Sequence, residues 1–370
     1  MRIGILSLNP GLNYGGILQS FALKTELEKM GHDTSIICKD VYKREPDLLH
    51  YLSRIIRMIK NRSSWQNTVV LERVYNRKIH IIRHNVDRFM QKYLHRTMIS
   101  CFCDIKEYDF DCIVVGSDQV WRPIYFESQY LQPIENAFLS FTNGWNIKRV
   151  AYAASFGIED WEYNVEQTKN CRGLLQQFDA VSVREDSGVD LCKNKFCVNA
   201  CKVIDPTLLL TGEDYIKIID FSNIPKSKGN LFVYILDKTD ELDRLVEKVA
   251  DDKSLIPFEI VIKHNQQNPK DNIYPPVESW IQGFRDAEFV ITDSFHACVF
   301  SLLFHKPFLV VGNKERGMTR FTSFLSQFGL EKCMVFDFQN YKELESVDFT
   351  YADSILADLR IIARNFLKSI

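Results

Sequence analysis

An aspartate, a serine and a histidine interrupt one of the most apolar stretches of the chain, EFVITDSFHACVFSLLFHKPFLVV at 288–311. The pattern predicts a strand that ends near Ser294 and a helix after it, with His296 in the first helical turn. A helix N-terminus favours a neutral imidazole, so a protonated His296 needs a nearby anion, either Asp293 or a bound phosphate. His296 would then be a general acid. The alternative is an ordinary helix cap beside an incidental histidine.

Polar residues also follow other predicted strands. In open α/β sheets, ligands bind beyond the carboxyl ends of the strands. The repeated placement therefore predicts a ligand site, although each residue alone would be an ordinary loop residue. The residues are Asn13, Tyr14, Gly15, Gly16, Ser117, Asp118, Gln119, Ser155, Arg184, Lys263 and His264.

Two further segments suit an anion. NYGG, at 13–16, opens a predicted helix and offers free backbone N–H groups, although a simple helix-start turn fits equally well. The fingerprint G-x-G-x-x-G is absent from the sequence, so NAD is not indicated. NKERGMTRF, at 313–321, carries Lys314, Arg316 and Arg320. Arginine suits bidentate binding of carboxylate or phosphate, whereas a solvated charged loop is the plainer interpretation.

The elements that would position these residues alternate between strand and helix, which predicts an α/β fold with parallel sheets. Strands are predicted at 2–8, 34–38, 111–117, 149–155, 180–185 and 202–210, and again at 230–236, 258–263, 288–294, 307–312 and 334–338. We therefore expect two Rossmann-like domains, at 1–211 and 229–345. A basic helical segment at 43–96 belongs to the first domain. A helix at 351–370 is expected to pack back on that domain.

The charge is unevenly distributed. The chain carries a net −2, which gives no bias toward nucleic acid, yet residues 43–96 hold 13 Lys and Arg against 4 Asp and Glu. Leu52, Ile55, Ile56 and Ile59 form an apolar stripe at helical spacing, interleaved with cations. This helix would either pack on its own domain or make a peripheral membrane contact through 48–62.

The ten cysteines predict no metal site, because no C-x₂-C pair occurs and no histidine lies near Cys192, Cys197 and Cys201. The N-terminus has no secretory pattern, and no apolar run reaches the length that spans a bilayer. We therefore expect a cytoplasmic protein with reduced thiols, possessing at most a peripheral contact at the inner face of the plasma membrane.

Seven stretches together resemble the polysaccharide pyruvyl transferase family. They are NYGGILQSFAL, FDCIVVGSDQVWRP, YAASFG, FDAVSVREDSGV, VIDPTLLL, VITDSFHACVFSLLFHKPF and the later TRF. They follow the family's order along nearly the whole chain. The family's frequent SFHG is SFHA here, with Ala297, and its DQVWN is DQVWR, with Arg122. Neither departure removes a titratable group.

The resemblance implies two Rossmann-like domains similar to the B-type glycosyltransferase fold. It implies transfer of pyruvate from phosphoenolpyruvate, as co-substrate, onto two hydroxyls of a sugar or lipid-linked oligosaccharide. The product is a cyclic ketal in bacterial capsule, exopolysaccharide or cell-wall polymer, and no metal is required. A nucleotide-sugar glycosyltransferase of the same fold and a non-catalytic sugar- or anion-binding protein are the alternatives.

The reaction assigns roles to the polar residues. His296 is the expected general acid, with Asp118 or Asp293 as base or orienting group. Donor binding is expected from Arg184, Arg316 or Arg320, Ser294 and Lys263. Acceptor binding is expected from Asn13, Tyr14, Gly15, Gly16, Ser117, Gln119, Arg122 and Ser155.

Overall fold

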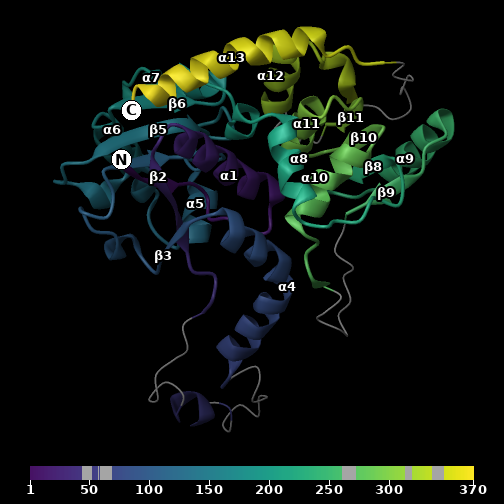
Figure 1. The fold of residues 1–370 in the computed structure, drawn as a ribbon. Helices are drawn as coiled ribbons and strands as arrows, with labels where there is room; N and C mark the ends of the chain where they lie inside the picture. Colours follow the sequence, from purple (N-terminus) through teal and green to yellow (C-terminus); the bar gives the residue numbers. More distant parts are fainter. Residues whose placement is uncertain (44–51, 57, 59–68, 261–271, 313–318, 336–345) are drawn as a thin grey trace.

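The first of two parallel sheets begins at the N-terminus. The computed structural model describes residues 1–43, 52–56, 58, 69–260, 272–312, 319–335 and 346–370 (Figure 1). The sheet has seven strands in the order β3-β2-β1-β4-β5-β6-β7. Their bounds are β1 (Arg2–Leu6), β2 (Asp33–Lys39), β3 (Arg96–Ile99), β4 (Cys112–Val115), β5 (Lys148–Ala154), β6 (Ala180–Val183) and β7 (Cys201–Lys202). Its helices are α1 (Tyr14–Lys29), α4 (Leu71–Tyr93), α5 (Pro123–Tyr130), α6 (Val165–Leu175) and α7 (Asp186–Phe196).

The second sheet has five parallel strands in the order β12-β11-β10-β8-β9. They are β8 (Leu231–Tyr234), β9 (Pro257–Glu259), β10 (Phe289–Thr292), β11 (Phe308–Val311) and β12 (Met334–Val335). The helices that follow the first domain's β7 are α8 (Gly212–Asp220), α9 (Asp240–Lys253), α10 (Val277–Asp286), α11 (Phe295–Leu303), α12 (Thr319–Phe328) and α13 (Thr350–Lys368). The predicted class, α/β with two Rossmann-like domains, is confirmed.

Strand burial explains why the sheets are covered on both faces. Ile3 and Ile5 face the core that contains α1, whereas Leu6 faces the core that contains α5, α6 and α7. In β10, Val290 faces one core while Phe289 and Ile291 face the other. Side chains alternate across a strand, so strands buried on both sides read as continuous apolar runs.

Each sheet contains a point where the strand order reverses. In the first sheet β1 lies between β2 and β4, and in the second β8 lies between β9 and β10. Ligand sites in such sheets form outside the carboxyl ends of the strands at this reversal. The loops after β1, β4, β8 and β10 are therefore the segments best placed to form a site.

The predicted strand at 202–210 is wrong beyond its start. Strand β7 ends at Lys202, and a 3₁₀-helix, η4 (Pro206–Leu209), follows. Proline has no N–H to donate to a sheet, and the Asp205 side chain accepts from the backbone N–H of Thr207, which starts the turn. The edge strand β3 was not predicted.

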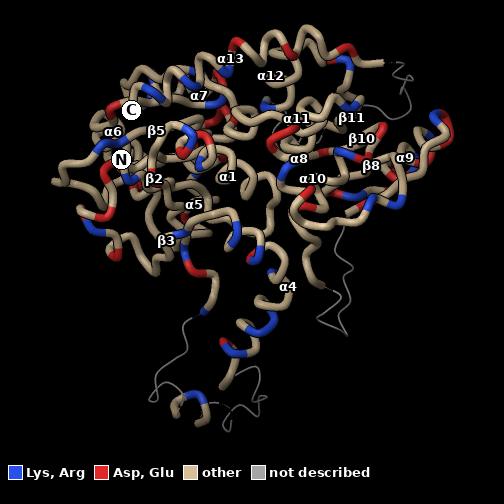
Figure 2. The backbone as a smooth tube through the Cα atoms, viewed as in Figure 1, with Lys and Arg blue, Asp and Glu red and all other residues tan. Residues whose placement is uncertain are grey.

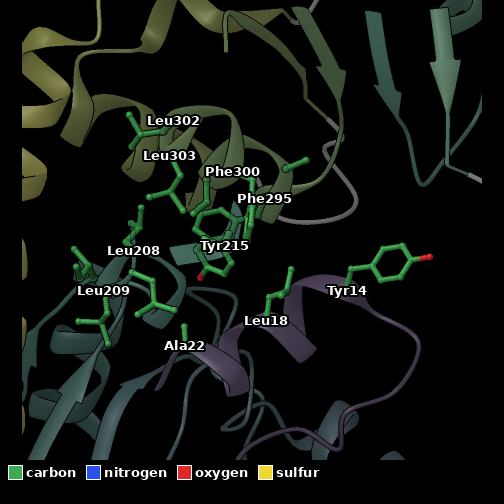
Figure 3. Close-up of a cluster of buried hydrophobic side chains, with 14 of the residues drawn as sticks. Tyr14, Leu18, Ala22, Leu208, Leu209, Tyr215, Phe295, Phe300, Leu302 and Leu303 are labelled. Atoms are coloured by element: carbon green, nitrogen blue, oxygen red, sulfur yellow. The ribbon is translucent and has the colours of Figure 1, made fainter. Parts of the chain in front are cut away.

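A single apolar core joins the two domains. Figure 3 shows its centre, where Leu18 and Ala22 of α1, Leu208 and Leu209 of η4, Tyr215 of α8 and Phe300 of α11 gather. The ring centroids of Tyr215 and Phe300 are 4.7 Å apart. Because η4 contacts both α1 and α11, this turn packs between the domains.

Helix α13 crosses from the second domain to the first (Figure 1). His305, after α11, lies 2.9 Å from the Asp353 carboxylate near the start of α13. Farther along, Arg360 donates to the carbonyls of Leu208 and Leu210, and Arg364 pairs with Glu26 of α1. Among the described residues, no helix combines the length and apolar character that crossing a bilayer requires.

The expectation of reduced thiols is wrong for one pair. Cys101 and Cys103 form a disulfide, with Cα atoms 5.3 Å apart, because the turn at η1 (Phe102–Asp104) brings the two side chains together. The eight remaining cysteines are free thiols, and six of them are buried.

Candidate active site

A cleft of about 870 Å³ opens between the two sheets. Most of its walls come from the loops after β1 and β4 on one side and after β8 and β10 on the other, and residues of α5, α12 and the segment before α10 complete them. These residues of the predicted site line it: Asn13, Tyr14, Asp118, Gln119, Arg122, Asp293, Ser294, His296 and Arg320.

His296 lies at the floor of this cleft, in the first turn of α11, and is only 6% exposed. Ser294 occupies the N-cap position, but its side chain makes no capping hydrogen bond. The imidazole packs directly against the backbone of Gly15 at the start of α1, where a Cβ atom would overlap the ring. Gly15, the first glycine of NYGG, is therefore needed for the close approach of the N-termini of α1 and α11.

The anion beside His296 is Asp205, which was not among the predicted site residues. Its Oδ2 lies 3.8 Å from His296 Nε2 and accepts hydrogen bonds from Arg184 and Gln19. Burial alone would raise the pKa of Asp205, but the charges of Arg184 and His296 and the hydrogen bonds from Thr207 hold it below its ordinary value. Asp205 is thus a buried carboxylate that stays ionised.

Burial lowers the pKa of His296 below its ordinary value. Asp205 and Asp118 act in the opposite direction, and the cations Arg184 and Arg320 add to the lowering. Within the described residues His296 Nε2 makes no hydrogen bond. In the ligand-free protein the imidazole is therefore biased toward its neutral form, and an anionic ligand would shift it toward the charged form.

Two guanidinium groups flank one aromatic ring next to His296. The Arg184 Cζ atom lies 4.9 Å and the Arg320 Cζ atom 5.9 Å from the centroid of Phe295. Both arginines also line a cavity of about 30 Å³ against Phe295. Burial, together with the charge of Arg184, lowers the pKa of Arg320. Two like charges held this close in a buried place favour an anion between them.

Arg184 is held in place by its own acidic partners. It donates to Asp205 over 2.6 Å, and its Nε lies 3.3 Å from Glu185 Oε1. The buried Nη2 atom has no hydrogen-bond partner among the described residues. Arg184 therefore combines a fixed orientation with a donor left over for a ligand.

Asp293, the other carboxylate predicted near His296, is hydrogen-bonded to the end of β8. Its two carboxylate oxygens accept from the backbone N–H groups of Leu236 and Asp237, at 2.8 and 2.9 Å. Thr292 next to it donates to the carbonyl of Tyr234. These bonds tie the ends of β8 and β10 together, which is a positioning role within the cleft wall.

Asp118 occupies the opposite wall, after β4. Its φ of 65° is left-handed, a conformation that aspartate tolerates better than most residues. Its carbonyl accepts from the backbone N–H of Ser155. The negative charge of Asp118 opposes the lowering of the His296 pKa and contributes to the raised pKa of Arg184, so its carboxylate acts on the centre of the site.

Ser117 and Ser155 lie in the interior and not on the cleft wall. The Ser117 hydroxyl accepts from Gln19, and the Ser155 hydroxyl donates to Glu185 and accepts from Gly157 N–H. They support the residues that hold Asp205 and Arg184. Gly15 and Gly16 are also absent from the cleft lining.

The outer cleft brings together the other predicted acceptor residues. Asn13 caps α1 by accepting from Gly15 N–H, and the Tyr14 hydroxyl donates to the carbonyl of Pro275 in the second domain. Arg122 forms two 3.0 Å hydrogen bonds to Glu162 and one to Gln119. Its charge is therefore already paired within the protein.

Some residues of this site were missed, and others lie outside the described residues. Lys263, His264, Lys314 and Arg316 belong to the second group. The missed polar residues are Gln19, Glu185 and Asp205 around His296, and Tyr125, Gln129, Tyr234, Lys238 and Tyr274 on the cleft wall. Asp205 lies in VIDPTLLL, where an aspartate before proline signals a turn, but its tertiary neighbours gave no sequence signal.

The fold and site define a two-domain α/β protein with a cleft between parallel sheets, lined by a buried histidine and by arginine and aspartate side chains. The polysaccharide pyruvyl transferase family model matches residues 13–315, so the chain belongs to that family. The match begins at Asn13, the cap of α1. No curated protein matches the chain.

Solved structures with similar folds share little sequence. UDP-GlcNAc 2-epimerase from Neisseria meningitidis is 10% identical with a TM-score of 0.46, and both chains are covered completely. Arabidopsis thaliana UGT89C1, solved with UDP-L-rhamnose, is 9% identical with a TM-score of 0.49, covering 99% of this chain and 94% of the other. E. coli heptosyltransferase WaaC, solved with ADP, is 10% identical with a TM-score of 0.40, and the match covers 97% of this chain and 100% of the other.

Proposed function

We propose that the protein transfers pyruvate from phosphoenolpyruvate onto two hydroxyls of one sugar, forming a cyclic ketal and inorganic phosphate. The product would belong to a bacterial capsule, exopolysaccharide or cell-wall polymer. The observation that carries this proposal is the pair of guanidinium groups, Arg184 and Arg320, around Phe295 and beside His296. Phosphoenolpyruvate has a phosphate and a carboxylate, so separated cations next to a proton donor suit it.

In this proposal His296 is the general acid. Binding of the anionic donor raises the pKa of His296, and Asp205 supports the charged form. The imidazolium gives its proton to the methylene carbon of the enol, which becomes a methyl group. The adjacent carbon gains oxocarbenium character, and the first sugar hydroxyl forms a C–O bond to it.

Phosphate then leaves with the electron pair of its C–O bond, and the second hydroxyl attacks the same carbon and closes the ring. One hydroxyl proton restores His296 and the other leaves with phosphate, so no oxidant or metal is needed to balance the step. Asp118 is the carboxylate that we propose as base, because it faces the cleft from the first domain, whereas Asp293 is bonded to backbone N–H groups.

The acceptor half of the cleft supports a sugar. Tyr125, Tyr234 and Tyr274 line it together with the polar side chains of Asn13 and Gln119. Aromatic faces with a few fixed polar groups are typical of small-molecule clefts. We assign acceptor binding to this part of the cleft, where Tyr125 of the first domain faces Tyr234 and Tyr274 of the second, and donor binding to the part near α11 and α12.

The test is incubation of the protein with phosphoenolpyruvate and a panel of diol-bearing sugars. We expect phosphate release that depends on the acceptor, and a pyruvyl ketal in the mass spectrum of the product. Stabilisation by phosphoenolpyruvate against heat, without stabilisation by nucleotide sugars, is expected in parallel. Transfer from a nucleotide sugar, or binding of phosphoenolpyruvate that never leads to phosphate release with any acceptor, would contradict the proposal.

A further inference from the structure

Helix α4 forms an arm that leaves the body of the protein (Figure 1). It has 23 residues, so it is about 34 Å long at 1.5 Å per residue. Its buried side chains are Glu72, Arg83, Val86, Phe89 and Met90. Apart from Glu72, all of them lie in the second half of the helix. The first half therefore extends away from the core and presents its side chains outward.

The far end of the arm exposes apolar side chains. A short helix at 52–56 is fixed to α4 by Arg54, which donates to both carboxylate oxygens of Glu72 at 2.6 and 2.9 Å. We call residues 52–56 and 71–78 the arm tip. Its exposed apolar residues are Leu52, Ile56, Leu71 and Val74, which are 42 to 68% exposed. Arg54 holds these two segments together, so four exposed apolar side chains lie on one end of the arm.

The same arm is strongly basic, as the blue segments along α4 in Figure 2 show. The described residues 52–56, 58 and 69–93 carry seven Lys and Arg and two Asp and Glu, a net of 7 − 2 = +5. Arg54 pairs with Glu72 and Arg83 with Asp87, so the acidic groups are matched within the arm. The five other cations are exposed: Arg73, Arg77, Lys78, Arg88 and Lys92.

The base of the arm is hydrogen-bonded to the wall of the active-site cleft. The carbonyl of Ile82 accepts from the backbone N–H of Tyr274 at 2.9 Å, and the Asn85 side chain donates to the Tyr274 carbonyl at 2.8 Å. Tyr274 lines the cleft. A surface bound by the arm tip would therefore be held at a fixed place relative to the cleft.

We propose that the arm tip docks on an anionic lipid surface, which would hold the cleft against an acceptor sugar carried by a lipid in that surface. Exposed apolar side chains surrounded by cations fit a bilayer interface, where the chains enter the headgroup region and the cations meet anionic lipids. The second half of this inference rests on the proposed pyruvyl transfer. The first half stands on the arm alone and places the protein peripherally on an anionic membrane surface.

The structure also decides which residues test the docking. Arg54 is unsuitable, because its ion pair with Glu72 fixes the short helix. Arg77 and Lys78 are exposed on the first half of α4, away from the cleft. Lys169 of α6 and Lys193 of α7 are exposed cations on the far side of the first sheet, so their reversal makes the same charge change outside the arm.

Docking is measured by co-sedimentation of the full chain with vesicles, without substrates. We expect binding to vesicles that contain phosphatidylglycerol, little binding to phosphatidylcholine alone, and weaker binding as salt rises. Loss of one cation costs about fivefold in partitioning, so Arg77→Glu with Lys78→Glu should weaken binding by roughly 25-fold or more. Leu71→Ser with Val74→Ser should also weaken it. Lys169→Glu with Lys193→Glu should change it little.

Absence of binding to the anionic vesicles would overturn the docking proposal, as would an equal loss in the Lys169/Lys193 control. Tighter binding to a duplex oligonucleotide than to the vesicles at the same salt would assign the arm to nucleic acid and overturn it too.

The acceptor is tested with one sugar in two forms, soluble and attached to a lipid in vesicles. We expect Arg77→Glu with Lys78→Glu to reduce turnover of the lipid-linked form at least tenfold and to leave the soluble form unchanged. Equal turnover of both forms by this variant would overturn the lipid-linked acceptor. Failure of the wild-type protein on both forms of the sugar, with vesicle binding intact, would contradict the proposed function and not the docking.

Discussion

His296 is the residue through which the proposed chemistry depends on pH. Burial holds its pKa low in the free protein, and a bound anion raises it. Between these two pKa values, phosphoenolpyruvate binding takes up a proton, so affinity should weaken as pH rises through the pKa of the complex. We expect calorimetry in buffers of different ionisation enthalpy to detect this uptake.

His296→Gln should abolish the proton uptake and reduce turnover by about 10²–10⁴. Glutamine keeps a polar side chain of similar length, so the thermal unfolding midpoint should remain close to that of the wild type. A folded variant with normal turnover would exclude His296 as the acid.

Substitution of each of the two arginines around Phe295 should have a different effect, one on donor affinity alone and the other on stability as well. Arg320→Ala should weaken phosphoenolpyruvate binding by about 1.5–3 kcal/mol, the usual loss of a charged hydrogen bond, with acceptor affinity preserved. Arg184→Ala should also destabilise the fold by about 3–5 kcal/mol, because Asp205 and Glu185 would stay buried without their cation. Titration calorimetry measures the donor affinity, and urea unfolding measures the stability. Unchanged donor affinity in Arg320→Ala would remove it from the donor site.

At the scale of elements, the contact between the N-termini of α1 and α11 should be intolerant of any added atom. Gly15→Ala places a methyl group inside the His296 ring, so the imidazole must move, and we expect turnover to fall at least tenfold. Gly16→Ala is the matched control, because its Cβ would have no neighbour closer than 3.9 Å.

In Gly16→Ala, alanine should leave activity intact and raise the free energy of unfolding by about 0.5–1 kcal/mol, the ordinary helix preference over glycine. Steady-state kinetics and urea unfolding of the two variants provide the comparison. Equal activity in both would show that the ring has room to move without cost to the reaction.

For the whole molecule, α13 should stabilise the turn that carries Asp205. Arg360 donates at 2.7 and 2.6 Å to the carbonyls of Leu208 and Leu210. Arg360→Ala removes these charged donors and should lower the free energy of unfolding by about 1.5–3 kcal/mol. Lys368→Ala, an exposed cation at the end of the same helix, should change it by less than about 0.5 kcal/mol. Urea denaturation followed by circular dichroism distinguishes them, and equal stability would mean that α13 packs without a role for Arg360.

The predicted parts of the site are those that depend on local pattern. Strands buried on both faces, helices between them and polar residues at strand ends all leave a signal within a few residues, so His296, Asp118 and Arg184 could be predicted as neighbours. The prediction of a strand at 202–210 was wrong because Asp205 and Pro206 start a 3₁₀-helix, whose place in the fold depends on tertiary contacts. The bonds from Asp293 to the end of β8 had no signal in the sequence either, because they join residues more than 50 positions apart.

The sequence by itself determined the alternation of elements and the set of chemical groups, since side-chain periodicity and residue type are local properties. The tertiary structure decided which groups meet. Asp205 reaches His296 only because η4 packs between α1 and α11, and Gly15 matters only because α11 approaches it. Ser117 and Ser155 lie inside because their partners, Gln19 and Glu185, come from other elements. Such pairings join positions from 15 to 296, and their distances are fixed by packing of the elements and not by spacing along the chain.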